Sequence, residues 1–234
     1  MLSQLMVAMF VLLSFRGGGP LPEVQSAEKP AVAEVFLAQD PSAPAGEVVG
    51  LYSGHSDDVI GPLALAAGRY VVSANYVGDS NFVIWAHTGV EESDLLINEI
   101  GNYSGRVYLQ LDSSSVVLFE VTGDGDWTLQ LERLPATQDP AMAPVEVAGS
   151  FSGQSDDVIG PLTMAPGLYV ISTSYRGDSN FVVWAHTGSE WGDLLVNEIG
   201  DYSGEVVLQL DIQSEVVFEV IGIGDWTIEV SRVS

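Results

Sequence analysis

The sequence GDSNFVIWAHTG at residues 78–89 decides the architecture, because it returns as GDSNFVVWAHTG at residues 177–188. Working outward, residues 50–132 align without a gap with residues 149–231, and about two thirds of the positions are identical. Self-similarity at a fixed spacing identifies the unit of the fold. Because units of this size can close their own hydrophobic cores, unlike short solenoid repeats, two copies of one domain are predicted.

Each copy shows apolar and polar residues alternating along short segments. In the first copy the apolar positions are Tyr70, Val72, Ala74 and Tyr76, then Val107, Leu109 and Leu111, then Trp127, Leu129 and Leu131. The second copy keeps the same phase in every segment. A period of two is typical of half-buried antiparallel strands. With about eight such segments per copy and no helical stripe, we expect an all-β protein of two tandem β-sandwich domains that are jelly-roll-like.

Turn-forming residues separate these segments and predict where the chain reverses. The first copy offers five candidates: Ser53-Gly54, Gly61-Pro62, Gly78-Asp79-Ser80-Asn81, Tyr103-Ser104-Gly105 and Gly123-Asp124-Gly125. These residue types adopt positive φ angles or form turn hydrogen bonds through short side chains. Each is therefore predicted to connect two strands.

The segments outside the repeats divide the chain further. The predicted parts are a signal-peptide-like leader (1–27), an Ala/Pro-rich linker (28–46), the first repeat (47–133), a Pro-rich linker (134–145) and the second repeat (146–234). The apolar run of the leader has the length of a signal-peptide core, so export to the cell surface or the extracellular space is expected. An uncleaved hydrophobic anchor is the alternative, and a misassigned start codon is a third.

Charge and composition exclude several functions. The formal net charge is -25, from 32 acidic and seven basic residues. This charge repels phosphate backbones and anionic lipid, so no nucleic-acid partner and no membrane insertion of the mature domains are expected. The excess also suits solubility, recognition of a basic partner or a high-salt habitat. The absence of cysteine excludes disulfides, thiolate nucleophiles and cysteine-based zinc sites.

Several short motifs of the first repeat resemble a known kind of module. They are Asp57-Asp58-Val59-Ile60, Ala67-Gly68-Arg69-Tyr70, Gly78-Asp79-Ser80-Asn81-Phe82 and Gly125-Asp126-Trp127-Thr128. The repeat resembles a widespread bacterial secreted β-sandwich module and is distantly similar to bacterial pre-peptidase C-terminal domains. This resemblance implies a non-catalytic appendage of extracellular proteins and transfers no catalytic residue. Because we recognise no enzyme domain beside the modules in these 234 residues, we do not expect an accessory role to a covalently linked enzyme.

Two tryptophan–histidine pairs are candidate ligand-binding residues. Trp85 and His87 share one face of a predicted strand, and Trp184 and His186 repeat them. Flat aromatic rings on a β-sandwich surface suit stacking on sugar rings or on an apolar patch of a partner. The competing interpretation, which we favour, is a core tryptophan beside a hydrogen-bonded histidine. Trp191, in a predicted loop without an equivalent tryptophan, either anchors a ligand or packs between the domains.

Cofactor and catalytic motifs are weak. Structural calcium is considered because Asp57-Asp58, Asp79 and Asp124-Gly125-Asp126 supply oxygens, but a turn role is favoured and no cofactor or metal site is assigned. Ser80, His87 and Asp94 are the nearest approach to a serine triad, and no nucleophile elbow or metalloprotease helix is present. We therefore expect no enzyme and no catalytic residue.

The function expected from the sequence is binding of extracellular material. An exported two-module protein could bind a polysaccharide or a surface protein, with avidity if both modules bind. One alternative is a structural spacer or a self-associating unit of an extracellular assembly, and another is a hydrolase of unrecognised type. The sequence does not predict the oligomeric state.

Overall fold

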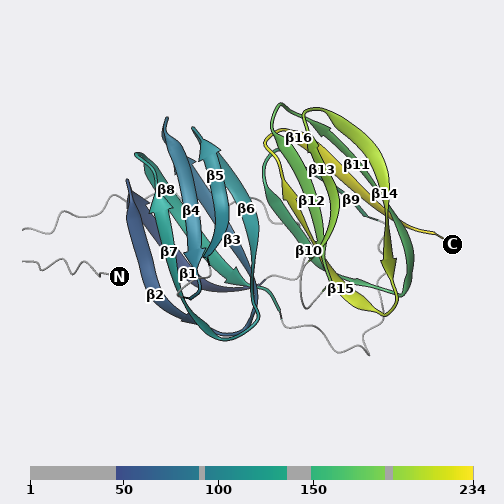
Figure 1. The fold of residues 1–234 in the computed structure, drawn as a ribbon, viewed down its shortest axis with the longest axis horizontal. Coiled ribbons are helices and arrows are strands. Elements are labelled where there is room, and N and C mark those ends of the chain that lie inside the picture. The colour runs from purple at the N-terminus through teal and green to yellow at the C-terminus, as the bar shows by residue number, and fades with distance from the viewer. Residues whose placement is uncertain (1–45, 90–92, 136–148, 188–191, 234) are drawn as a thin grey trace, which may run out of the picture. The chain divides into compact units, whose positions relative to one another are not determined.

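The computed structural model describes residues 46–89, 93–135, 149–187 and 192–233. These residues form 16 strands in four sheets of four strands each and contain no helix, so the expected all-β class is confirmed (Figure 1). No helix in this part of the chain is long and apolar enough to cross a membrane. The predicted leader and most of both linkers lie outside the described residues.

The first repeat contains eight strands in two sheets. Its strands are β1 (Glu47–His55), β2 (Asp58–Leu65), β3 (Gly68–Val77), β4 (Asn81–His87), β5 (Ser93–Ile100), β6 (Tyr103–Leu111), β7 (Ser115–Thr122) and β8 (Asp126–Arg133). The two sheets have the orders β1-β8-β3-β6 and β2-β7-β4-β5, and every pairing is antiparallel. This is the strand order of a jelly roll, which confirms the expected sandwich.

The second repeat has the same topology. Its strands are β9 (Gly149–Gly153), β10 (Asp157–Met164), β11 (Gly167–Arg176), β12 (Asn180–His186), β13 (Asp193–Ile199), β14 (Tyr202–Leu210), β15 (Ser214–Ile221) and β16 (Asp225–Arg232). The sheets read β9-β16-β11-β14 and β10-β15-β12-β13. In both repeats the third and sixth strands pair in the same register, and the sixth strand is a sheet edge.

Each sandwich encloses its own hydrophobic core, and the predicted alternation defines it. The predicted apolar positions of β3, β6 and β8 are all buried in the first core. The second core contains the equivalent positions of β11, β14 and β16 except Thr173, a buried polar residue in place of Ala74, and Val206 is only half-buried at its margin. The register inferred from period-two alternation is therefore confirmed in both copies.

Three of the five predicted turns are wrong. Ser53-Gly54 lies inside β1, Gly61-Pro62 lies inside β2, and Tyr103-Ser104-Gly105 begins β6. At Gly61-Pro62 the pairing of β2 with β7 shifts register, which makes the motif a β-bulge instead of a chain reversal. The turns at residues 78–80 and 123–125 are confirmed.

Close packing of aromatic side chains explains why glycine stands inside a strand at one misassigned turn. A Cβ atom on Gly54 would lie 2.3 Å from the indole of Trp127, and the equivalent atom on Gly153 would lie 2.3 Å from the indole of Trp226. Only glycine fits beneath these rings. The residue type was therefore a correct signal of a special position, but the demand comes from packing and not from a turn.

Candidate functional site

Trp85 and His87 lie on the outer face of β4, not in the core. β4 is an interior strand whose inner face carries the fully buried Phe82 and Ile84. Trp85 and His87 alternate with those residues and are half-buried. The favoured expectation of a core tryptophan is therefore wrong, because the strand is interior within its sheet but its outer face is only partly covered.

His87 is held by two neighbours on this outer face. Its Nε2 lies 3.0 Å from Oε2 of Glu120 on β7, and its Nδ1 lies 2.8 Å from the hydroxyl of Ser93. In the first repeat a tryptophan, a histidine and a carboxylate thus share one partly open surface. This arrangement has the chemistry to stack on a flat ligand and to accept or donate hydrogen bonds.

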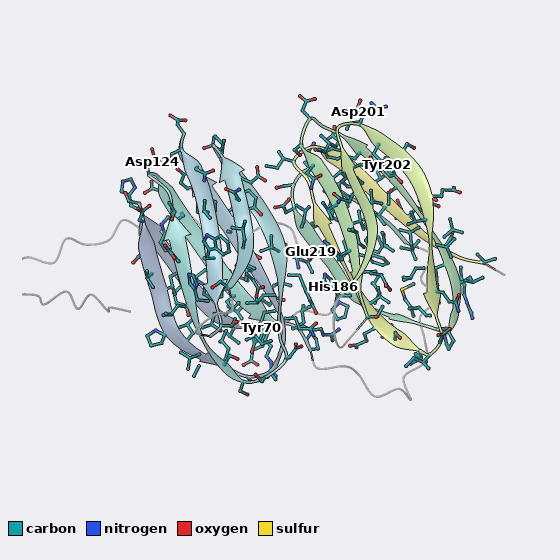
Figure 2. The ribbon with its side chains drawn as sticks, viewed as in Figure 1. Tyr70, Asp124, His186, Asp201, Tyr202 and Glu219 are labelled. Carbon is teal, nitrogen blue, oxygen red and sulfur yellow. The ribbon has the colours of Figure 1, made fainter. Side chains whose placement is uncertain are left out.

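The equivalent pair of the second repeat has a different environment. His186 again lies 3.0 Å from a glutamate, Glu219 (both labelled in Figure 2), but its ring also stacks on Tyr108 of the first repeat, with centroids 4.2 Å apart. The side chain of His186 is 14% exposed, against 33% for His87. The two predicted platforms are therefore not equivalent, because the second is engaged by the other repeat. Trp191 lies outside the described residues.

Comparison of equivalent positions defines this contact, which we call the repeat interface. The two sandwiches belong to one compact unit. Val158 of β10 is 2% exposed while its counterpart Val59 is 58% exposed. Val217 of β15 is fully buried while its counterpart Leu118 is 36% exposed. Since the domains are otherwise alike, the difference comes from what covers the outer face of the β10-β15-β12 sheet.

An apolar cluster forms the centre of the repeat interface. The first repeat contributes Val71 and Tyr108, and Leu134 directly follows that repeat. The second repeat contributes Val158 and Val217. Leu134, the first residue of the predicted linker, is buried, and its N–H donates to the carbonyl of Arg69. The linker therefore begins with a residue that belongs to the interface.

Two ion pairs flank the apolar cluster. Arg69 of β3 lies 2.6 Å from Glu215 of β15, and both side chains are nearly inaccessible to water, at 8% and 7% exposure. Arg106 of β6 lies 3.1 Å from Asp157 and is more exposed. Nη2 of Arg69 also donates to the carbonyl of Pro135, whereas its buried Nη1 has no hydrogen-bond partner among the described residues. Separating such a pair leaves a buried charge without its partner, so the pair favours the relative position in which the two side chains meet.

The repeat interface also completes an edge strand. β6 is the edge of its sheet, and an edge leaves alternate backbone groups unpaired. The N–H of Arg106 donates to the carbonyl of Asp156 at 2.9 Å, and the N–H of Tyr108 donates to Oε1 of Glu219 at 2.9 Å. The second repeat thus supplies the hydrogen-bond acceptors that a further strand would have supplied.

Asp156 is the most constrained carboxylate of the interface. Its Oδ1 accepts from the N–H of Gly222, and its Oδ2 accepts from the hydroxyl of Tyr103 at 2.9 Å. Burial raises the pKa of Asp156 above its usual value, although both hydrogen bonds act in the opposite direction. Burial, with the charge of Asp156 beside it, also raises the pKa of Tyr103 well above its usual value.

The weaker candidates occupy turns or lie apart. Asp57 accepts from the N–H of Gly123, and Asp124 accepts from the hydroxyl of Tyr76, which are the turn roles expected for them. Among the described residues no group of three or more histidine and carboxylate side chains could hold a metal ion. Ser80 directly precedes β4 and His87 is its last residue, so the two lie roughly 20 Å apart at the rise of a strand and the structure does not bring them together.

No protein-family model matches the chain, and no curated protein matches it. The repeat interface and the outer faces of the two sandwiches are therefore the features from which a function can be inferred.

Sequence reasoning found the tryptophan–histidine faces but missed the repeat interface. A signal was present: Arg69, Arg106 and Glu215 have counterparts of different charge in the other repeat, namely Leu168, Glu205 and Val116. Taken singly, such differences indicate only outward-facing positions. Taken together, they identify two surfaces that contact each other in the repeat interface, whereas the equivalent surfaces of the other repeat do not.

Proposed function

We propose that this is an exported, non-enzymatic protein of the cell surface or extracellular space whose two repeats act as one stiff structural unit. The observation that carries the proposal is the buried Arg69–Glu215 pair between the sandwiches. A tethered pair of independent binding modules would have no need of such a contact. A spacer or an assembly unit requires it, because its role depends on a fixed distance and direction between its ends.

The composition of the repeat interface supports stiffness. Its centre is apolar, its flanks are ion pairs, and backbone N–H groups of β6 donate across it. Opening it would expose apolar side chains to water and would separate a desolvated ion pair from its surroundings. Domains joined only by a flexible linker move freely unless their interface is substantial and apolar. The two repeats are therefore expected to reorient as one body.

A matched pair of substitutions tests this proposal. Val217→Asp places a charge in the repeat interface, and Leu118→Asp places the same charge at the equivalent exposed position of the first repeat. In small-angle X-ray scattering of dilute protein, Val217→Asp should increase the radius of gyration and flexibility, and Leu118→Asp should change neither. A wild-type protein already as flexible as Val217→Asp would contradict the proposal.

Ligand binding through the first repeat is a second candidate, favoured by the partly open face of Trp85, His87 and Glu120. A neutral polysaccharide is the first ligand to try, because the net charge opposes polyanions. Saturable binding that is lost in Trp85→Ala and kept in Trp184→Ala would support one site per chain. Binding lost equally in both variants, or absent from the wild type, would exclude this site.

A further inference from the structure

The repeat interface joins two different surfaces, and a copy of each remains free. The first repeat contributes β3 and the edge strand β6, whereas the second contributes the outer face of β10, β15 and β12. Because both repeats have the same fold, the second repeat carries its own equivalent of the β3-β6 surface on β11 and β14. The first repeat likewise carries its own equivalent of the other surface on β2, β7 and β4. We call these the β11-β14 surface and the β2-β7 surface.

Both free surfaces expose apolar side chains at positions whose counterparts are buried in the repeat interface. On the β2-β7 surface, Val59 and Val116 are each 58% exposed. On the β11-β14 surface, Leu168 is 44% and Val207 is 64% exposed. In a chain with a net charge of -25, exposed apolar side chains on two defined faces indicate surfaces that a partner covers.

The free surfaces differ from the buried ones in a matched way. Within the chain, Arg69 faces Glu215. The counterpart of Arg69 on the β11-β14 surface is Leu168, and the counterpart of Glu215 on the β2-β7 surface is Val116. If the two free surfaces meet as the internal ones do, an apolar pair replaces the ion pair at these two positions, and neither position holds an unpaired buried charge.

The edge strand of the β11-β14 surface is also available. β14 pairs with β11 in the register that β6 uses with β3, so the N–H groups of Glu205 and Val207 point outward as those of Arg106 and Tyr108 do. Glu120 is the counterpart of the Glu219 acceptor on the β2-β7 surface. The backbone bonds of the repeat interface can therefore form a second time.

From this repetition we infer that the β11-β14 surface of one molecule binds the β2-β7 surface of a second copy of the chain, in the geometry of the repeat interface. The contact is heterologous, because it joins two different surfaces. When two molecules associate, one β2-β7 surface and one β11-β14 surface stay free, so further molecules can add and form an open, head-to-tail polymer. The inference rests on the proposed structural function and names a second copy as the partner. It leaves each polymer with one free surface of each kind, at opposite ends.

One contact opposes this association. Where Arg106 faces Asp157 within the chain, Glu205 would face Asp58 between chains. This like-charge contact adds to the general repulsion between acidic molecules, and both are screened by salt. Association is therefore expected at high protein concentration and to increase with ionic strength. Glu205→Arg restores the sign found within the chain and should strengthen association roughly tenfold.

Complementary variants make the contact testable. Leu168→Arg and Val116→Glu each place an unpaired charge in the proposed contact, at positions exposed in the monomer, and each should weaken association more than roughly a hundredfold. The double variant Leu168→Arg/Val116→Glu reproduces the Arg69–Glu215 pair and should associate again. Mixing the two single variants should also restore association, because each chain then finds a complementary surface on the other.

Sedimentation velocity over a range of protein and salt concentrations measures these effects on the full chain. The inference is supported if wild type and Glu205→Arg form a concentration-dependent series of oligomers, the single variants do not, and their mixture does. It is overturned if Glu205→Arg stays monomeric or if Leu168→Arg associates as strongly as the wild type. Scattering of the monomers separates the two proposals: a stiff monomer that never associates leaves the spacer function standing, whereas two freely moving repeats contradict both.

Discussion

The free surfaces carry leucine and valine where the repeat interface carries Arg69 and Glu215. Substituting these apolar residues singly and together should separate the free-energy cost of one unpaired buried charge from the contribution of the ion pair to stability. The nitrogen–oxygen distance is 2.6 Å, and the side chains are 8% and 7% exposed. Removing one partner of so buried a pair typically costs about 3–5 kcal/mol. We therefore expect Glu215→Val alone to destabilise the unit by about that amount. The loss cannot exceed the free energy of opening the repeat interface, because opening it would hydrate Arg69.

The double variant Arg69→Leu/Glu215→Val is expected to behave differently. Replacement of buried ion pairs by apolar residues is often neutral or stabilising by about 1–4 kcal/mol. Nη1 of Arg69 has no hydrogen-bond partner in the described part of the chain, which favours the stabilising end of this range. The bond from Nη2 to the carbonyl of Pro135 is lost, at about 1 kcal/mol. The balance predicts a double variant at least as stable as the wild type.

Denaturant unfolding of wild type, both single variants and the double variant forms the cycle that measures this. Arg176→Leu, at an exposed arginine outside the repeat interface, is the control and should stay within about 0.5 kcal/mol of wild type. The reasoning is refuted if Glu215→Val costs less than about 1 kcal/mol, or if the double variant is less stable than either single variant.

Three further predictions concern Asp156, the tryptophans and the packed glycines. The pKa of Asp156 is raised in the fold, so the native state holds the proton of this carboxyl more tightly than the unfolded state does. The free energy of unfolding should therefore fall as pH rises from the usual aspartate pKa through the raised value. Asp156→Asn should flatten that part of the pH profile and stabilise the protein at neutral pH. In single-tryptophan proteins, acrylamide should quench Trp85 more than the core residues Trp127 and Trp226, and equal quenching would contradict the outward placement. Gly153→Ala should cost about 1–3 kcal/mol in thermal unfolding, because its Cβ would meet the indole of Trp226, while the exposed Ser152→Ala should have little effect.

The duplication and the alternation of side chains were sufficient to predict the two sandwiches and the inward face of most strands. Strand alternation is a local property, so Tyr70 and Leu129 could be placed in the core without knowledge of the sheet order. The turn at Ser53-Gly54 was wrong because the signal of a glycine is ambiguous. The residue that excludes a Cβ there, Trp127, is distant in sequence.

The candidate site was predictable only in part. Trp85 and His87 were correctly assigned to one face of a strand, but the exposure of that face depends on what packs against it. His87 and His186 differ in exposure because the ring of Tyr108, which belongs to the first repeat, covers His186 of the second. No periodicity reveals such a contact. The differences in charge between positions 69, 106 and 116 and their counterparts 168, 205 and 215 are the sequence signal of this contact.

Amide hydrogen exchange by NMR, at a dilution where the protein is monomeric, tests the repeat interface most directly. The amides of Arg106 and Tyr108 donate across the interface, whereas those of Glu205 and Val207 hold the same positions on the free edge strand β14. A stiff two-repeat unit predicts strong protection for the first pair and fast exchange for the second. Equal, fast exchange of all four amides would contradict the account.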